Sequence, residues 1–130
     1  MLVKKNKNRE GVALITLIFF VLIATIYISA AVIIMGINSL AATSTALGMS
    51  ASRLAEGALE DTFLRLIRDP TYAGGTFNLD GGSATVNVVN TDGTRDITVT
   101  AEVGNYRRKY QAQVLFMETE MTILSWKEVF

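Results

Sequence analysis

Residues 1–37 read MLVKKNKNREGVALITLIFFVLIATIYISAAVIIMGI, and this stretch decides the fold of the N-terminal part of the chain. None of the 26 residues from Val12 to Ile37 carries a charge, and almost all of them are apolar. As a helix they would extend over roughly 39 Å, at about 1.5 Å per residue, which is enough to cross a hydrocarbon core of about 30 Å. We therefore expect a transmembrane helix over residues 12–37.

A soluble core helix or a secretory signal fits this apolar stretch less well. A buried helix of a large soluble protein needs a core that a chain of 130 residues does not supply. A secretory signal would be shorter and would be followed by a cleavage site of small residues. Four cations precede the stretch: Lys4, Lys5, Lys7 and Arg9. By the positive-inside rule we expect a single-pass protein with its N-terminus in the cytoplasm and its C-terminal domain outside.

The clearest break in composition lies before the apolar stretch, at the junction REG/VALIT of residues 9–16. This junction resembles the type III signal of type IV pilins and type II secretion pseudopilins. In that family a prepilin peptidase cuts after the Gly of a short basic leader and methylates the new N-terminus, while the apolar helix stays in the mature protein. The resemblance implies a basic leader over residues 1–11, with Gly11 before the cut and Val12 as the first mature residue.

The resemblance also implies how such a chain assembles. Its partners would be other pilin or pseudopilin subunits, the prepilin peptidase, an assembly platform in the inner membrane, and membrane lipid. Most pilins carry Glu at the fifth mature position, where it is thought to pair with the charged N-terminus of a neighbouring subunit. Here that position is Thr16, which cannot form an ion pair. Within the family this departure resembles the minor pilins and the tip pseudopilins, which initiate or cap filaments.

Composition limits the other classes of function. The chain has no Cys and no His, so it has no disulfide and lacks the commonest general base and metal ligand. The leader holds four of the 12 cations and one of the 12 anions, so its removal leaves 8 and 11, a net charge of −3. We therefore expect no nucleic-acid partner. No catalytic constellation, phosphate loop or zinc spacing is present in the sequence, and we expect neither an enzyme nor a cofactor.

Residues 38–69 are expected to continue the helix, giving one helix of about 50 residues after the leader. A stripe of small and apolar side chains recurs at three- and four-residue spacing: Ala55, Leu59, Thr62, Phe63 and Leu66. The charged side chains fall roughly opposite: Arg53, Glu60, Asp61, Arg65 and Arg68. Asp61 and Arg65 are spaced to form an ion pair. Pro70 disfavours helix at the residue before it, so the helix should end near Asp69.

After Pro70 the apolar period changes from 3.6 to 2, which predicts a small antiparallel β domain over residues 70–130. Candidate strands are TFNL, ATVNVVN, RDITVTAEV and YRRKYQAQVLFM, separated by turn sequences, and the tail METEMTILSWKEVF could add a short strand. Val86, Val99 and Val114 lie on the apolar strand face, which we expect to cover Leu59, Phe63 and Leu66 of the helix. The fold class is therefore α+β, a pilin-like long helix packed on a small sheet.

Three features leave alternatives open. Asp80, Asp92 and Asp96 lie in or beside Gly-rich turns, where they could bind calcium or simply form the turns. The cations of residues 107–109 could contact an acidic partner or DNA, although charge on an edge strand is the commoner use of such a run. Trp126 could anchor an interface or cap the core of the domain.

The sequence thus predicts a structural subunit, of the minor kind, in a type IV pilus-like or pseudopilus filament. It would be anchored in the cell membrane before assembly and would polymerise through its N-terminal helix into a cell-surface filament. The alternative is an uncleaved single-span membrane protein whose small extracytoplasmic domain binds a partner.

Overall fold

The structure is a computed structural model that describes residues 7–79, 81–117 and 120–130. The chain divides into two compact units, Met1–Ala42 and Thr43–Phe130, with the boundary inside the single helix α1. The apolar stretch of α1 belongs to the first unit, and the rest of the helix belongs with the strands to the second.

Helix α1 spans Lys7–Arg68, 62 residues, and so begins inside the expected leader rather than after it. Glu10 lies in its first turn and Arg65 and Arg68 in its last, where each charge is favoured by the helix dipole. The end of the helix agrees with the effect expected of Pro70. The backbone N–H of Asp69 still donates to the carbonyl of Arg65, at 2.7 Å, and the chain then leaves the helix through a turn in which the N–H of Tyr72 donates to the carbonyl of Asp69.

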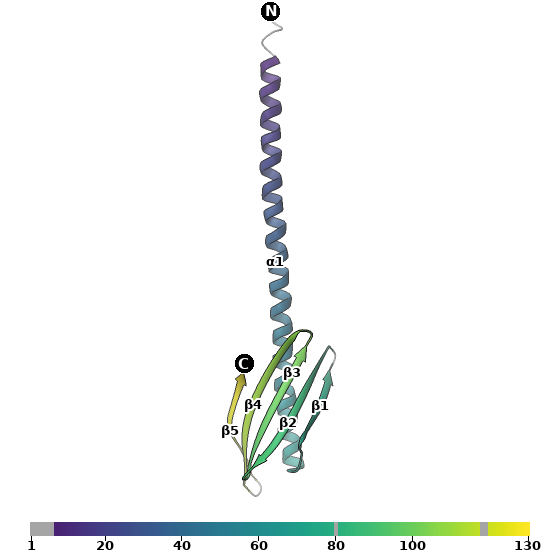
Figure 1. Ribbon diagram of the computed structural model, residues 1–130, viewed down its shortest axis with the longest axis vertical. Helices are drawn as coiled ribbons and strands as arrows, with labels where there is room; N and C mark the ends of the chain where they lie inside the picture. The colour runs from purple at the N-terminus through teal and green to yellow at the C-terminus, as the bar shows by residue number, and fades with distance from the viewer. Residues whose placement is uncertain (1–6, 80, 118–119) are drawn as a thin grey trace, which may run out of the picture. The chain divides into compact units, whose positions relative to one another are not determined.

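Five antiparallel strands follow the helix in the order β1-β2-β3-β4-β5, each paired with its neighbours along the chain (Figure 1). The strands are β1 (Gly74–Leu79), β2 (Gly82–Thr91), β3 (Thr94–Val103), β4 (Tyr106–Met117) and β5 (Glu120–Val129). The turn between β2 and β3 places Asp92 at φ 47° and Gly93 at φ 85°, the positive values that a two-residue hairpin turn requires. The expected meander is confirmed, and its last strand is as long as β2 and β3.

The core of the second unit lies between the sheet and the part of α1 that follows Thr43. Cross-strand partners such as Val86 and Val99 point to the same side, and both are buried against the helix. The predicted α+β class, a long helix on an antiparallel sheet, is therefore confirmed. The buried hydrophobic cluster comprises Ala55, Ala58, Leu59, Phe63, Leu66, Ala84, Val86, Val88, Ile97, Val99, Ala101, Tyr110, Ala112 and Val114.

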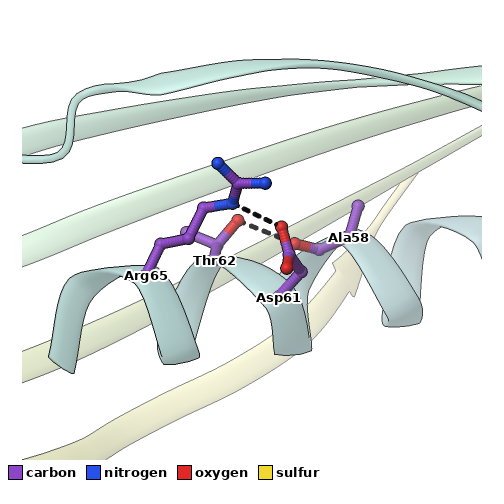
Figure 2. Close-up of polar contacts among 4 residues, drawn as sticks. All are labelled: Ala58, Asp61, Thr62 and Arg65. Atoms are coloured by element: carbon purple, nitrogen blue, oxygen red, sulfur yellow. Dashed lines mark hydrogen bonds and ion pairs between the residues drawn. The ribbon is translucent and has the colours of Figure 1, made fainter. Parts of the chain in front are cut away.

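Two polar contacts on α1 lie on different faces of this amphipathic helix, one in the buried core and one in solvent (Figure 2). Thr62 is buried in the core, and its hydroxyl donates to the carbonyl of Ala58 at 2.7 Å, so this buried hydroxyl has a hydrogen-bond partner. Asp61 and Arg65 form the expected ion pair at 2.7 Å, with both side chains largely in solvent.

Candidate functional site

The candidate site in the first unit is the apolar stretch of α1. By length and composition this helix can cross a membrane, and its most apolar window is not buried against any other part of the described chain. Large apolar side chains are exposed all around it, among them Phe20, Ile26 and Ile33. A continuous exposed apolar surface of this size indicates a membrane or a partner rather than water.

The hydroxyl groups of three residues within this stretch are satisfied inside the helix. Thr16 donates to the carbonyl of Val12 at 2.8 Å, Thr25 donates to the carbonyls of Val21 and Leu22, and Ser29 donates to that of Thr25. Because hydrocarbon offers no hydrogen-bond partners, a polar side chain is tolerated there when it bonds to its own backbone. These three side chains therefore add little polarity to the exposed apolar surface of residues 12–37.

Gly11 and Val12 both lie within α1 and are exposed. A Cβ added at Gly11 would meet no atom within 4 Å, so packing within the described chain does not require glycine at this position. Glycine lowers the stability of this part of the helix by about 1 kcal/mol relative to alanine.

The side chain of Thr16 is hydrogen-bonded to the backbone of Val12. Its hydroxyl donates to the Val12 carbonyl, one helical turn earlier in the chain. It carries no charge, so it cannot form an ion pair. The structure thus gives Thr16 a partner within its own helix.

The three helix residues expected to pack on the sheet lie in the core of the second unit. Leu59 and Leu66 are fully buried, and Phe63 is almost so. They share the hydrophobic cluster with Val86, Val99 and Val114, the strand positions named for this contact. The sequence did not indicate a polar link between helix and sheet at the other end of this core, where the hydroxyls of Ser52 and Tyr110 lie 2.6 Å apart.

The cation run of residues 107–109 lies on β4, which is an interior strand between β3 and β5. The expectation that these charges solubilise an edge strand is therefore wrong. Arg107 pairs with Glu102 across the β3–β4 ladder, and Arg108 pairs with Glu128 of β5 at 2.8 Å. Two of the three cations thus join neighbouring strands.

Of the three turn carboxylates, the structure describes Asp92 and Asp96. Asp80 lies outside the described residues. Asp92 occupies a hairpin turn, and Asp96 accepts a hydrogen bond from the side-chain amide of Gln113 at 2.8 Å. Within the described ranges, no three His, Cys, Asp or Glu side chains gather as metal ligands would.

Side chains of α1 on either side of the core contact different strands, which sequence periodicity alone did not resolve. Arg65 lies over the rings of Tyr72 and Phe77, at 5.7 and 5.2 Å from their centroids, on the side of β1. Phe63 contacts the ring of Trp126 on the side of β5, and Glu60 is three residues before it. In the sequence, residues 56, 60, 63 and 67 recur at helical spacing and therefore lie along one side of α1. Only the sheet shows which strand that side faces.

No protein-family model, curated protein or solved structure matches this chain.

Proposed function

We propose that this chain is a membrane-anchored structural subunit of a pilus-like or pseudopilus filament, cut after Gly11 and assembled through the apolar part of α1. The observation that supports this best is the exposed apolar surface of residues 12–37, in which the hydroxyls of Thr16, Thr25 and Ser29 are satisfied within the helix. Such a surface needs lipid before assembly and neighbouring helices after it. The sheet domain would be displayed outward from the filament.

The processing step is tested by measuring the intact mass of the protein purified from its own cells. The proposal predicts loss of the first 11 residues and addition of one methyl group at Val12. Gly11→Leu should keep the leader and leave the protein in the inner membrane, because the peptidase needs a minimal side chain before the cut. Gly36→Leu is the matched control, since a Cβ at Gly36 also meets nothing within 4 Å. A mature N-terminus at Val12 in the Gly11→Leu protein would contradict the type III signal.

The alternative, an uncleaved single-span protein with a binding domain, shares the membrane anchor but not the processing. It predicts the full-length mass, with Met1 or its processed form at the N-terminus and no methyl group. The same mass measurement therefore separates the two functions.

Thr16 supports a minor or tip position in the filament. A subunit without a carboxylate here needs no ionic partner, so Thr16→Val should assemble nearly as well as the wild-type protein. The protein should also be scarce relative to the major subunit of the same cell, as measured by quantitative mass spectrometry of purified filaments. Finding it as the bulk component would overturn the minor role and leave the filament role intact.

A further inference from the structure

One hydroxyl in the apolar stretch of α1 differs from the others in its hydrogen bonding. Residues 12–37 contain four side-chain hydroxyls, and those of Thr16, Thr25 and Ser29 donate to the backbone of their own helix. The fourth belongs to Tyr27. It sits at the far end of an aromatic ring and has no hydrogen-bond partner in the part of the chain that the structure describes. Tyr27 is also 73% exposed, so any partner of its hydroxyl lies outside this chain.

Water does not supply that partner, because Tyr27 lies deep in the apolar stretch. It is 15 residues after Val12 and 10 before Ile37, which is roughly 22 Å and 15 Å along a helix that rises about 1.5 Å per residue. Long side chains on a helix point back toward its N-terminus, which takes the ring of Tyr27 further from the nearer end. Lipid tails offer neither a donor nor an acceptor, and an unpaired hydroxyl among them is costly. The partner is therefore a group on another membrane-spanning helix.

Asn38 lies on the same side of α1 as Tyr27. Three turns of an α-helix take about 10.8 residues, so side chains 11 residues apart point in nearly the same direction. The side-chain amide of Asn38 also has no partner among the described residues. It directly follows the apolar stretch, at the edge of the hydrocarbon, so its need for a partner is weaker than that of Tyr27. We name this side the Tyr27 face, and it comprises Phe20, Ile23, Tyr27, Ala31, Ile34 and Asn38.

A second copy of the same helix, parallel and in register, satisfies both polar groups of the Tyr27 face. A phenol hydroxyl and an amide each donate and accept, so each can pair with its own copy. The two copies of Tyr27 meet at one level and the two copies of Asn38 at another, because their spacing is the same on both helices. A helix of different sequence would need matching groups at the same two levels, roughly 16 Å apart. The Tyr27 face carries no charge, so this pairing brings no like charges together.

We propose that the apolar stretch of α1 forms a parallel two-fold dimer in the membrane through the Tyr27 face, with a hydrogen bond between the two Tyr27 hydroxyls. Ala24 and Ala31 lie one turn before and one turn after Tyr27, and small side chains let the backbones of two helices approach closely. Both copies use the same face, so the contact closes at a dimer and does not extend from copy to copy. It therefore agrees with a minor or tip subunit and leaves the other sides of the helix to lipid or to other subunits.

The first measurement is dimerisation of the full-length chain in lipid vesicles. The natural chain has no cysteine, so donor and acceptor fluorophores are attached through Glu56→Cys, at an exposed position of α1, and energy transfer is followed as lipid dilutes the protein. Tyr27→Phe removes only the hydroxyl and should weaken the dimer about three- to tenfold, the range expected for one hydrogen bond between membrane helices. Asn38→Leu should weaken it less, because its amide lies at the edge of the hydrocarbon.

Thr25→Val is the matched control for Tyr27→Phe. It also removes a hydroxyl from the apolar stretch, but one that bonds to its own backbone and lies on the opposite side of the helix. It should leave the dimer unchanged.

Disulfide cross-linking in the same vesicles identifies the face that is in contact. Ile34→Cys places a thiol on the Tyr27 face, and Ile33→Cys places it one residue earlier, about 100° around the helix. Treated separately with a mild oxidant, the Ile34→Cys protein should give far more dimer than the Ile33→Cys protein.

Energy transfer no greater than that of randomly placed chains would overturn the dimer, and would mean that lipid or a different protein covers Tyr27. Equal cross-linking of the Ile33→Cys and Ile34→Cys proteins would reject the Tyr27 face as the contact. A Tyr27→Phe protein that dimerises as tightly as the wild-type protein would reject the hydrogen bond on which the inference rests.

These outcomes are independent of the proposed filament role, because the dimer requires the membrane span and not the cut after Gly11. The intact mass of the chain from its own cells decides the cut. A chain that dimerises but keeps its leader would support the dimer and contradict filament processing. A chain that is cut but does not dimerise would support processing and contradict the dimer.

Discussion

The ring of Trp126 on β5 meets the ring of Phe63 on α1 edge to face, with centroids 6.4 Å apart and planes at 77°. Phe63 is 8% exposed, whereas the neighbouring Leu64 is 63% exposed. Trp126 therefore lies against Phe63 in addition to the central strands of the hydrophobic cluster. The last strand of the sheet thus contributes to the surroundings of this buried helix residue.

Phe63→Ala should destabilise the second unit by about 3–5 kcal/mol, the usual loss for a large buried aromatic side chain. Phe63→Asp should unfold it, because an unpaired charge would also be buried. Membrane insertion should be unaffected, since residues 12–37 are unchanged. The measurement is thermal unfolding by circular dichroism, together with protease resistance, of the full chain in detergent micelles.

Leu64→Asp is the matched control for this change. It introduces the same charge one residue later, at an exposed position, and should alter stability by no more than about 0.5 kcal/mol. If Phe63→Asp melted like the wild-type protein while Leu64→Asp did not, the sheet would not be packed on this face of the helix.

Gly82 is a position at which β2 has no room for a side chain beside β3 and the helix. An added Cβ would lie 2.7 Å from Val103 Cγ2, 2.8 Å from the carbonyl oxygen of Glu102 and 2.9 Å from Leu54 Cδ2. The Glu102 oxygen belongs to the β2–β3 ladder and cannot move without disturbing it. Gly82→Ala should therefore destabilise the unit by about 1–3 kcal/mol, the usual range for overpacking.

Gly57→Ala should have the opposite effect. Gly57 is an exposed helical residue, and a Cβ there would meet nothing within 4 Å. Alanine favours the helix by about 1 kcal/mol relative to glycine. Both variants can be compared with the wild type by chemical denaturation. Equal midpoints for Gly82→Ala and the wild type would mean that Gly82 has more room beside Val103, Glu102 and Leu54 than the structure gives it.

Most of the fold could be predicted from sequence because its signals are local. The uncharged residues 12–37 need no partner to be recognised as a lipid-length helix, and Pro70 marks the end of α1. The alternation of β2 and β3 follows directly from a sheet with one buried face, as in Val86, Val99 and their neighbours.

The last strand was expected only as a possible short addition because its alternation is interrupted. Gln113 pairs with Ser125 while Val114 pairs with Ile123, so Leu124 is an extra residue in the β4–β5 ladder. Such a bulge shifts the pattern of apolar residues by one position, so the sequence of the strand does not show a continuous alternation of apolar and polar residues. The wrong placement of β4 at an edge followed from this, since β5 is the strand that covers it.

The residues of the candidate site could be predicted from the sequence only where all of them lie on one helix. The junction at residues 9–16 of the sequence identified Gly11, Val12 and Thr16. The structure adds the hydrogen bond from the Thr16 hydroxyl to the Val12 carbonyl. Phe63 of α1 meets Trp126 of β5, and these two residues are brought together only by the fold of the sheet. No local pattern contains that information.

The hydrogen bonds between Asp69 and Thr71, directly after the end of α1, depend on pH. The hydroxyl and the backbone N–H of Thr71 both donate to Oδ1 of Asp69, at 2.6 and 2.9 Å. These hydrogen bonds favour the charged carboxylate and lower the pKa of Asp69 below its ordinary value, the side-chain bond having the larger effect. A carboxyl group with a lowered pKa stabilises the folded state above its unfolded pKa, which is about 3.9, and loses that contribution as pH falls through the lower, folded value.

Asp69→Ala should therefore lower the unfolding temperature of the second unit by a constant amount above about pH 5, and the difference from wild type should shrink below about pH 4. Thr71→Val keeps the backbone donor but removes the hydroxyl, so it should produce part of the same loss with the same pH dependence. Asp92→Ala, which changes a carboxylate in the β2–β3 turn, is the control for general loss of negative charge. Unfolding temperatures measured between about pH 2.5 and pH 7 in matched ionic strength separate these cases. A difference between Asp69→Ala and wild type that stayed the same down to the lowest pH would show that the charged form of Asp69 does not stabilise the end of the helix.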